Sequence, residues 1–335
     1  MVFALLLLVA ASGTFEERFR AGLLALQRND LAAARSGLEG AAKLAPGNGR
    51  VWVALAQTYW KLKEGGRANA AAAKAEALGA RDAVVLSTLA IYYGEAGQGL
   101  KAAEAQARFA ALVPGDAAAR ERAETLYFEA AQALLQQGKF PEAITILRAG
   151  TGRLKDSAQL HLALGVAYYG LRRFDEAAGS FLRTIELAPE TEQPYGFLGK
   201  FLDQIPGRLP VVTKIFISYE QAHPDSFMGY FLHAKALNLQ SAEPETAMAL
   251  LQKAAGMNER DAPVHFELGT VFDRLRRYAE AAREFERAAE LAPDDAATHY
   301  RLSRVYDRLG KAEAAQAERD RHAALEKAAR EAPKQ

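Results

Sequence analysis

The segment from Asp261 to Asp294 restricts the fold of this chain more than any other stretch. Its pattern of apolar residues predicts two helices joined by a short turn, with Pro293 ending the second helix. The residues that share one face of a predicted helix are Leu268, Gly269 and Phe272 in the first and Ala281, Phe285 and Ala288 in the second. One helix pair cannot bury both faces, so this segment needs similar segments on either side.

The chain supplies such segments at intervals of about 34 residues, and we number the positions within each copy from 1 to 34. The expected copies begin at or near Phe15, Gly49, Ala83, Glu124, Ala158, Glu192, Phe227, Ala262 and Ala296. Residues 311–335 follow as a capping helix and tail, because Arg319 and His322 stand where apolar or small residues would be buried. The predicted fold class is an all-α solenoid of about nine helix–turn–helix repeats.

Residue types that recur at fixed positions indicate how the repeats pack. Gly or Ala at position 8 is expected to let the two helices of a repeat approach closely, against a small residue at position 20. Large residues at positions 4, 7, 11 and 24 are expected to fill the layer between neighbouring repeats. Residues Ala117 to Ala123 form an insertion of about one helical heptad, which should lengthen the next helix at its start.

The sixth copy departs from the pattern. The segment from Ile205 to Pro210 replaces the usual turn, and its second helix is expected to start at or after Pro210, because proline is tolerated in a first helical turn. We therefore expect repeats 1–6 over residues 14–205, and the rest of repeat 6 with repeats 7–9 over residues 206–310. The two prolines also suggest a flexible joint between residues 15–205 and 210–335.

The N-terminus has the composition of a secretory signal peptide over residues 1–13. Met1 to Ala11 is an unbroken apolar run followed by small residues, and it is shorter than the roughly 20 residues that span a bilayer. No Lys or Arg precedes it, so a buried N-terminal cap or a misplaced start codon remains the alternative. A signal peptide would place the protein in the periplasm or outside the cell, and its absence would place it in the cytoplasm. Thr14 and Glu17 form a capping box that begins a helix.

Charge and cysteine content limit the class of function. The formal net charge is +1, which argues against general binding of nucleic acid, since phosphate contacts require a basic surface. The chain has no cysteine, so disulfides, thiolate metal sites and cysteine nucleophiles are excluded.

The repeated segments resemble the tetratricopeptide repeat (TPR) family over roughly residues 15–315. The copy that matches the family pattern most fully carries Leu268, Gly269, Phe272, Ala281, Phe285, Ala288 and Pro293. The resemblance implies a right-handed superhelix whose first helices line a concave groove. It also implies a scaffold that binds a protein or peptide partner without catalysis or cofactor.

The family resemblance also implies which residues line the groove, since positions 2, 5, 9, 12 and 13 of the first helices supply most of it. The residues predicted to bind a partner are Trp60, Phe128, Tyr169, Lys200, Lys235, Arg274, Tyr300, Arg304 and Arg308, with Val53 and Asn238 also in the expected lining. The groove should change from apolar to charged along the chain. The alternatives are burial of apolar positions between adjacent helices and pairing of charges within a helix, as in Asp273–Arg277. The Lys and Asn residues of the family's chaperone-tail clamp are absent from the matching positions.

Catalytic patterns are weak. His161, His265 and His299 all fall at position 4, where packing is a better explanation than metal ligation, and the chain has no HExxH or GxSxG sequence. The predicted function is a protein-interaction scaffold. The alternative is a carrier of envelope polysaccharide or of its biosynthetic machinery, in which aromatic side chains would stack on sugars.

Overall fold

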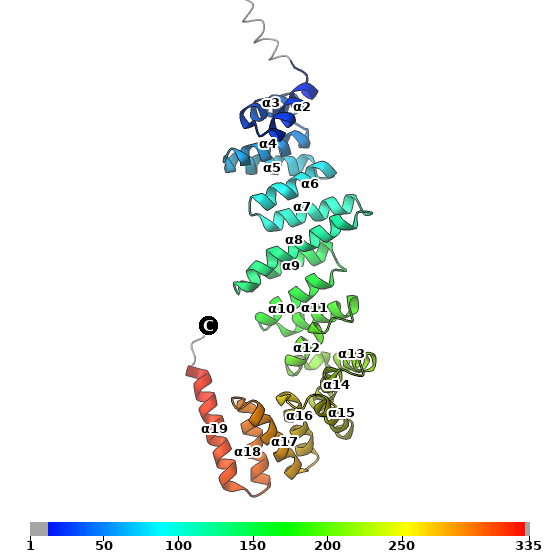
Figure 1. The fold of residues 1–335 in the computed structure, drawn as a ribbon, viewed down its shortest axis with the longest axis vertical. Coiled ribbons are helices and arrows are strands. Elements are labelled where there is room, and N and C mark those ends of the chain that lie inside the picture. The colour runs from blue at the N-terminus through cyan, green and yellow to red at the C-terminus, as the bar shows by residue number, and fades with distance from the viewer. Residues whose placement is uncertain (1–12, 332–335) are drawn as a thin grey trace, which may run out of the picture. The chain divides into compact units, whose positions relative to one another are not determined.

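The computed structural model describes residues 13–331, so the predicted signal peptide lies outside the described residues except for Gly13. Within the described part the chain is all helical, with 18 α-helices and no strand (Figure 1). The prediction of an all-α solenoid is confirmed. Helix ends follow the predicted repeats closely: the first helices begin at Phe15, Gly49 and Ala83, at the expected spacing of about 34 residues.

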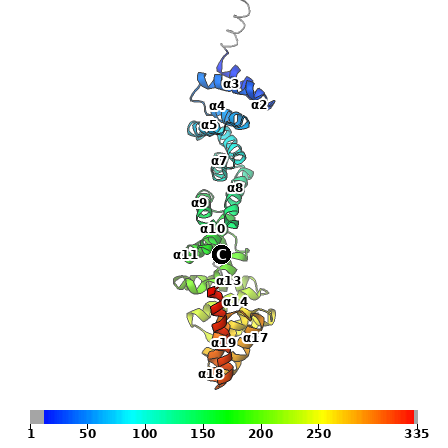
Figure 2. The same ribbon diagram turned by 90° about the vertical axis from the view of Figure 1, so that its left-hand side faces the viewer.

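The chain divides into two compact units, Met1–Ala188 and Pro189–Gln335. The helices of the first unit are α2 (Phe15–Gln27), α3 (Leu31–Leu44), α4 (Gly49–Lys61), α5 (Gly65–Leu78), α6 (Ala83–Glu95), α7 (Gly99–Leu112), α8 (Ala117–Gln136), α9 (Phe140–Arg153), α10 (Ala158–Gly170) and α11 (Phe174–Leu187). Consecutive helices of this unit pack against one another, as Figures 1 and 2 show for the segment coloured blue to green. The helix lengthened by the predicted insertion is α8.

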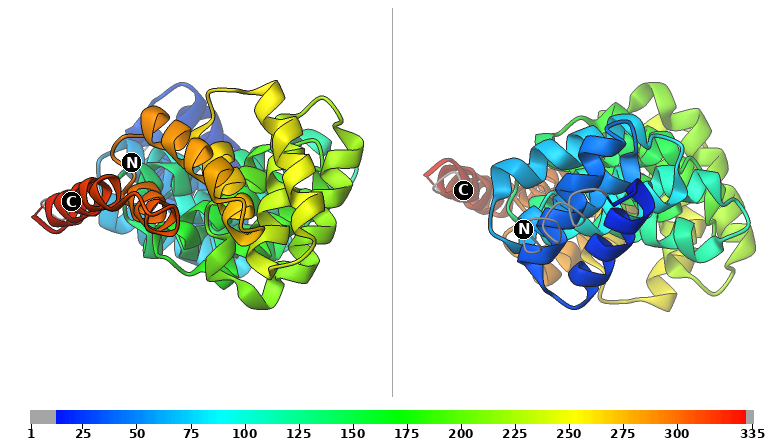
Figure 3. Two further views of the ribbon diagram at one scale, coloured as in Figure 1. Left: turned by 90° about the horizontal axis from the view of Figure 1, so that it is seen from below. Right: turned by 90° about the horizontal axis from the view of Figure 1, so that it is seen from above.

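The helices of the second unit are α12 (Gln193–Lys200), α13 (Leu209–Ala222), α14 (Phe227–Gln240), α15 (Pro244–Met257), α16 (Ala262–Arg274), α17 (Tyr278–Leu291), α18 (Ala296–Arg308) and α19 (Ala312–Glu331). Helix α19 is longer than α18 and extends beyond it (Figures 1 and 3). Ala315 is its only buried residue, which fits the predicted capping helix with a polar outer face.

Short polar side chains fix where the first helices begin. The oxygens of Asp82, Asp261 and Asp295 accept hydrogen bonds from backbone N–H groups in the first turns of α6, α16 and α18. The predicted capping box before α2 is present, because Thr14 N donates to Glu17 Oε2 at 2.9 Å and Glu17 N donates to Thr14 Oγ1 at 3.3 Å. Each such cap satisfies N–H groups that have no partner within the helix.

The turn from a first to a second helix uses a residue with positive φ. The residues concerned are Asn29, Lys63, Gly97, Gly138, Arg172, Ser241, Glu243, Arg276 and Gly310. The sixth repeat has two short 3₁₀ turns instead, η1 (Leu202–Gln204) and η2 (Pro206–Arg208). Its second helix, α13, begins at Leu209, one residue before the predicted limit, with Pro210 in the first turn. The suggested joint at this repeat stays a prediction.

Glycine at position 8 packs against a different neighbour from the one expected. A Cβ added to Gly269 would lie 2.8 Å from the ring of Phe285, at position 24 of the same repeat. Gly165 bears the same relation to Phe181, at 2.6 Å. The glycine therefore makes room for the large side chain at position 24, which is fully buried in both repeats. The expected contact with the small residue at position 20 is not the limiting one.

Position 4 carries a second recurring contact. In six repeats of the described chain, a ring nitrogen or hydroxyl at this position is hydrogen-bonded to the backbone carbonyl six residues earlier, in the turn that enters the repeat. The pairs are Trp52–Pro46, His161–Lys155, Tyr195–Pro189, Tyr230–Pro224, His265–Glu259 and His299–Pro293. We call this contact the entry latch. The packing role predicted for the three histidines is thus combined with a polar one.

No helix among residues 13–331 is long and apolar enough to cross a membrane.

Candidate functional site

The predicted partner-binding residues of the first unit lie on first helices and are partly buried. Trp60 on α4 meets the ring of Tyr92 edge-on, with 6.2 Å between centroids. Tyr169 on α10 lies 6.1 Å from the ring of Phe174, and Phe128 on α8 is also partly buried. Val53 does not belong to an open lining, because it is only 3% exposed within the core. Packing between adjacent helices therefore covers part of the face that the resemblance implied.

Two of the predicted cations in the second unit bind the end of the preceding first helix. Lys235 Nζ donates to the carbonyl oxygen of Gly199 at 2.9 Å, and Arg274 Nη2 donates to that of Asn238 at 2.7 Å. Carbonyls in a last helical turn lack partners within the helix and carry the negative end of its dipole. These two side chains therefore stabilise the stacking of repeats.

The alternative given above, a pairing of Asp273 with Arg277, is wrong. Asp273 pairs with Arg308 of the next repeat, and Arg277 pairs with Glu280 in its own repeat. The geometry explains the difference, since a side chain at position 13 of one first helix reaches position 12 of the helix before it. Lys200, Tyr300 and Arg304 are exposed, and Arg304 Nη1 donates to the Tyr300 hydroxyl at 3.3 Å.

Sequence reasoning missed a buried polar pair on the same face. Asn238 Nδ2 donates to Glu267 Oε2 at 2.8 Å, and Asn238 is only 4% exposed. Burial raises the pKa of Glu267, although the Asn238 hydrogen bond and the charges of Lys235, Arg301 and Arg274 act in the opposite direction. Position 6, where Glu267 lies, is not among the groove positions of the family, so the pattern gave no signal for it.

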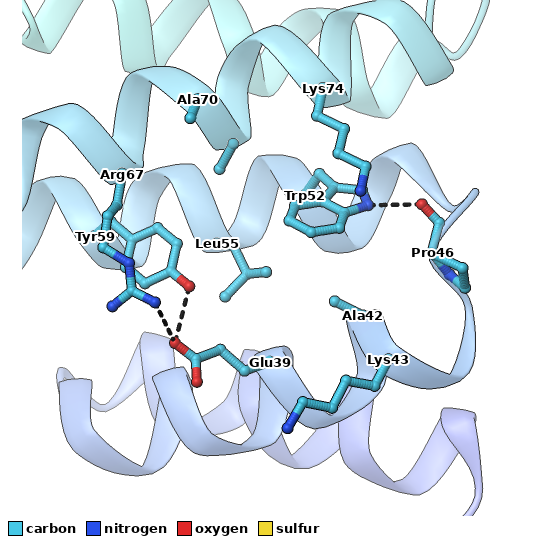
Figure 4. A pocket seen from close by; sticks show the side chains of 11 residues that line it. Glu39, Ala42, Lys43, Pro46, Trp52, Leu55, Tyr59, Arg67, Ala70 and Lys74 are labelled. Atoms are coloured by element: carbon cyan, nitrogen blue, oxygen red, sulfur yellow. Dashed lines mark hydrogen bonds and ion pairs between the residues drawn. The ribbon is translucent and has the colours of Figure 1, made fainter.

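A hollow lies on the opposite side of the repeats, between the second helices α3 and α5 (Figure 4). Its volume is about 610 Å³, within the range of ligand sites in proteins. Helix α4 supplies its floor through Trp52, Leu55 and Tyr59. The rims are Glu39, Ala42 and Lys43 on the α3 side and Arg67, Ala70, Ala71 and Lys74 on the α5 side. We call this hollow the second-helix groove.

An ion-pair network closes one end of the second-helix groove. Tyr59 Oη donates to Glu39 Oε1 at 2.9 Å, and Arg67 Nη2 donates to the same oxygen at 3.2 Å. Arg35 joins Glu39 to Glu64 through bonds of 3.0 Å to each. Burial alone would raise the pKa of Glu39, but the hydrogen bonds of Tyr59 and Arg35 and the charges of Arg35 and Arg67 hold it below its usual value. Glu39 is therefore a carboxylate whose charge is already neutralised.

The other end of the groove is basic and aromatic. Lys74 Nζ lies 3.7 Å from the centroid of the Trp52 ring, and Trp52 Nε1 donates to the carbonyl oxygen of Pro46 at 2.8 Å. Lys43 stands on the opposite rim (Figure 4). Because Glu39 is paired, the charge that the groove presents to an incoming group is positive.

The side chains that line the equivalent groove differ from repeat to repeat. It is open in the fifth repeat, with a volume of about 420 Å³, where the residue at position 23 is Ser180 in place of Ala71. In the eighth and ninth repeats the residue is a glutamate that bonds the histidine at position 4, through Glu284–His265 at 2.7 Å and Glu318–His299 at 2.6 Å. In the third repeat Arg108 crosses the groove to Glu76 at 2.7 Å. A small residue at position 23 together with a ring at position 4 is the sequence pattern that could have indicated an open groove.

Family models match two parts of this architecture. A model described as the tetratricopeptide repeat matches residues 128–191, and another with the same description matches residues 262–295. No curated protein matches the chain in sequence. Among solved structures, a thermophilic TPR protein from Thermus thermophilus aligns over 50% of this chain and 98% of its own, at 24% identity and a TM-score of 0.43.

Two further solved structures have similar helices. PilF of Pseudomonas aeruginosa aligns over 59% of this chain and 90% of its own, at 18% identity and a TM-score of 0.47. PilW, described as a widely conserved type IV pilus biogenesis factor, aligns over 58% of this chain and 90% of its own, at 16% identity and a TM-score of 0.49.

Stacked helix pairs of about 34 residues with a small residue at position 8 define an α-solenoid built from one repeated unit. The chain is a tetratricopeptide-repeat protein.

Proposed function

We propose that this protein is a non-catalytic scaffold that binds a protein or peptide partner along the face of its first helices. The observation that supports this most is the exposure of large side chains at one repeat position. At position 9, Leu23 is 36% exposed and Ile91 is 56% exposed, while Lys200 and Arg304 are exposed at the same position of later repeats. Large apolar side chains left in solvent at a repeated position favour an interface.

The two units offer different chemistry on this face. The first unit offers the partly buried rings of Trp60, Phe128 and Tyr169 beside Ile91, and the second offers Tyr300 with the cations Lys200 and Arg304. Aromatic side chains and arginine are enriched among residues that dominate binding energy. Lys235, Arg274 and Arg308 contribute less to a partner in this proposal, because each is already bonded to a neighbouring repeat.

Site-specific photocrosslinking tests the proposal. A photoreactive residue replaces Ile91 or Tyr300 on first helices, and Leu112 or Met257 on second helices as matched controls, since all four are large side chains between 40% and 56% exposed. We expect the same partner to crosslink at Ile91 and Tyr300 and not at the two control positions. Crosslinking confined to Leu112 and Met257 would refute the first-helix face.

We also propose that the protein is exported, on the basis of the apolar run from Met1 to Ala11. Sequencing the N-terminus of the protein recovered from the periplasm or medium tests this. A mature chain that begins near Thr14 is expected. A chain that retains Met1 and is found in the cytoplasm would contradict export.

A further inference from the structure

We propose that the second-helix groove of the second repeat is an additional binding site, for a peptide segment that pairs a large apolar side chain with an adjacent acidic residue. The site lies between α3 and α5 and does not depend on the first-helix face. The apolar side chain would occupy the space above Leu55, and the carboxylate would lie beside Lys74 at the Trp52 ring (Figure 4).

The shape of the groove supports an apolar occupant. Ala42, Ala70 and Ala71 line its sides, so no side chain larger than a methyl group projects from these positions into the space above Leu55. Leu55 is itself 1% exposed and belongs to the core, which gives the groove a firm apolar floor. Ala42 and Ala71 are also nearly buried, so the apolar surface that a large side chain would remove from water there is mainly that of the exposed Ala70 and the partly exposed Trp52 ring.

In two other repeats of this chain, an acidic side chain lies at the position that Ala71 occupies in this groove. In the eighth and ninth repeats, Glu284 and Glu318 bond the position 4 histidines on the first helix of the same repeat. In the second repeat the residue in their place is Ala71, and the ring at position 4 is Trp52, whose N–H is already bonded to Pro46. The carboxylate that other repeats supply from within is therefore missing from this one.

Charge complementarity identifies the sign of the occupant. Lys43 and Lys74 stand on opposite rims, and the Lys74 ammonium contacts the face of Trp52, with 3.7 Å to the ring centroid. The carboxylate of Glu39 is held by Tyr59, Arg35 and Arg67 at the far end. An acidic group beside Lys74 would gain a partner without displacing any of these bonds.

The two tryptophans of the chain give a direct test, because Trp52 lines the second-helix groove and Trp60 lies on α4 among the predicted first-helix residues. The full chain is labelled with 5-fluorotryptophan, and the two ¹⁹F signals are assigned with Trp52→Phe and Trp60→Phe. The probes are the matched dipeptides N-acetyl-Asp-Phe-amide and N-acetyl-Asn-Phe-amide, which differ only in charge.

We expect N-acetyl-Asp-Phe-amide to shift the Trp52 signal in a saturable way and to leave the Trp60 signal in place. The asparagine peptide should bind about threefold more weakly or worse, because exposed ion pairs are modest in strength, and added salt should reduce the difference. Lys74→Ala should remove the preference for aspartate. Lys101→Ala, which removes an exposed lysine that contacts Tyr93 in the next repeat, should leave it unchanged.

Three results would overturn the proposal: a shift of Trp60 alone, equal binding of the two dipeptides, or no response of Trp52 at millimolar peptide. A further variant, Ala71→Glu, gives this groove the glutamate that the eighth and ninth repeats have at the same position, Glu284 and Glu318. This variant should abolish the Trp52 shift. Because Lys74 is exposed, its replacement by alanine keeps the test informative even if Ala71→Glu fails to fold. Failure of this site would leave the first-helix proposal intact, since that proposal is read from crosslinks at Ile91 and Tyr300.

Discussion

The indole N–H of Trp52 donates a 2.8 Å hydrogen bond to the backbone carbonyl of Pro46. The bond joins the first helix of the second repeat to the turn that precedes it. Five other repeats in the described part of the chain make the same entry latch with tyrosine or histidine. In these six repeats position 4 carries a ring with a polar atom, and a purely apolar ring there would fill the volume without holding the turn.

Replacing Trp52 with phenylalanine should lower the free energy of unfolding. Phenylalanine fills most of the volume of the indole ring, but the carbonyl of Pro46 loses its hydrogen-bond donor. The loss of that bond should lower the free energy of unfolding by about 1 kcal/mol. Urea denaturation followed by circular dichroism measures the change. Trp60→Phe is the control, since Phe retains the edge-on contact with Tyr92. An equal loss in the two variants would mean that the entry latch adds nothing beyond ring volume.

Gly269→Ala should destabilise the second unit by about 1–3 kcal/mol, because the new methyl group would lie 2.8 Å from the Phe285 ring in a filled core. Gly196→Ala is a matched control in the same unit, in helix α12, where an added Cβ meets no atom within 4 Å. It should be neutral or stabilising, since alanine favours helix over glycine. Thermal melts that move together for the two variants would contradict this account of position 8.

Glycine at a left-handed turn residue should stabilise the chain. Lys63 and Arg276 adopt φ values of 62° and 58°, which are unfavourable for residues with a Cβ. Lys63→Gly and Arg276→Gly should each raise the free energy of unfolding by about 0.5–1 kcal/mol after the greater flexibility of unfolded glycine is included. The reciprocal change Gly97→Ala, at φ 70°, should lower it. Urea midpoints at unchanged slope measure all three.

The stability contributed by His265 should depend on pH. Its hydrogen bond to Glu284 raises the pKa of His265 above its ordinary value of 6.5, with burial acting against the rise. Folding therefore favours the protonated form of His265. Its contribution to stability is complete below the pKa of His265 in the unfolded chain, and it is lost as the pH rises through the higher pKa of the folded state. The difference in unfolding free energy between wild type and His265→Gln should shrink as the pH rises above 6.5 and through the raised pKa of His265 in the folded state.

His161 provides a comparison of opposite sign. Burial lowers the pKa of His161, although its bond to the Lys155 carbonyl acts the other way. Folding therefore favours the neutral ring of His161. Its contribution to stability is present above the pKa of His161 in the unfolded chain, and it is lost as the pH falls through the lower pKa of the folded state. The difference in unfolding free energy between wild type and His161→Gln should shrink as the pH falls. If both variants show the same pH trend, at least one of the two histidines does not titrate as its contacts indicate.

Sequence periodicity predicted the helices because each repeat presents the same apolar face to its neighbours. The cap at Thr14 and the lengthened α8 could be read directly from residue types and spacing. The contact of Gly269 with Phe285 could not, since positions 20 and 24 both lie on the facing helix and only coordinates show which side chain comes closer.

The polar contacts between repeats were the hardest to foresee. Arg308 and Asp273 are separated by 35 residues, and a pairing rule for neighbours along one helix pointed instead to Arg277. The second-helix groove was missed for a related reason. The groove is open because the side chain of Ala71 is only a methyl group. The family pattern specifies which residues build the fold, and it does not specify which volumes stay empty.

The entry latch has a consequence for how the chain folds during synthesis. Each one closes over six residues, so the nascent polypeptide can form it as soon as that short segment leaves the ribosome. Each repeat then provides a surface on which the following repeat can assemble, and loop closure over long distances is avoided. The order of translation is thus also a feasible order of assembly, one helix pair at a time from the N-terminal side.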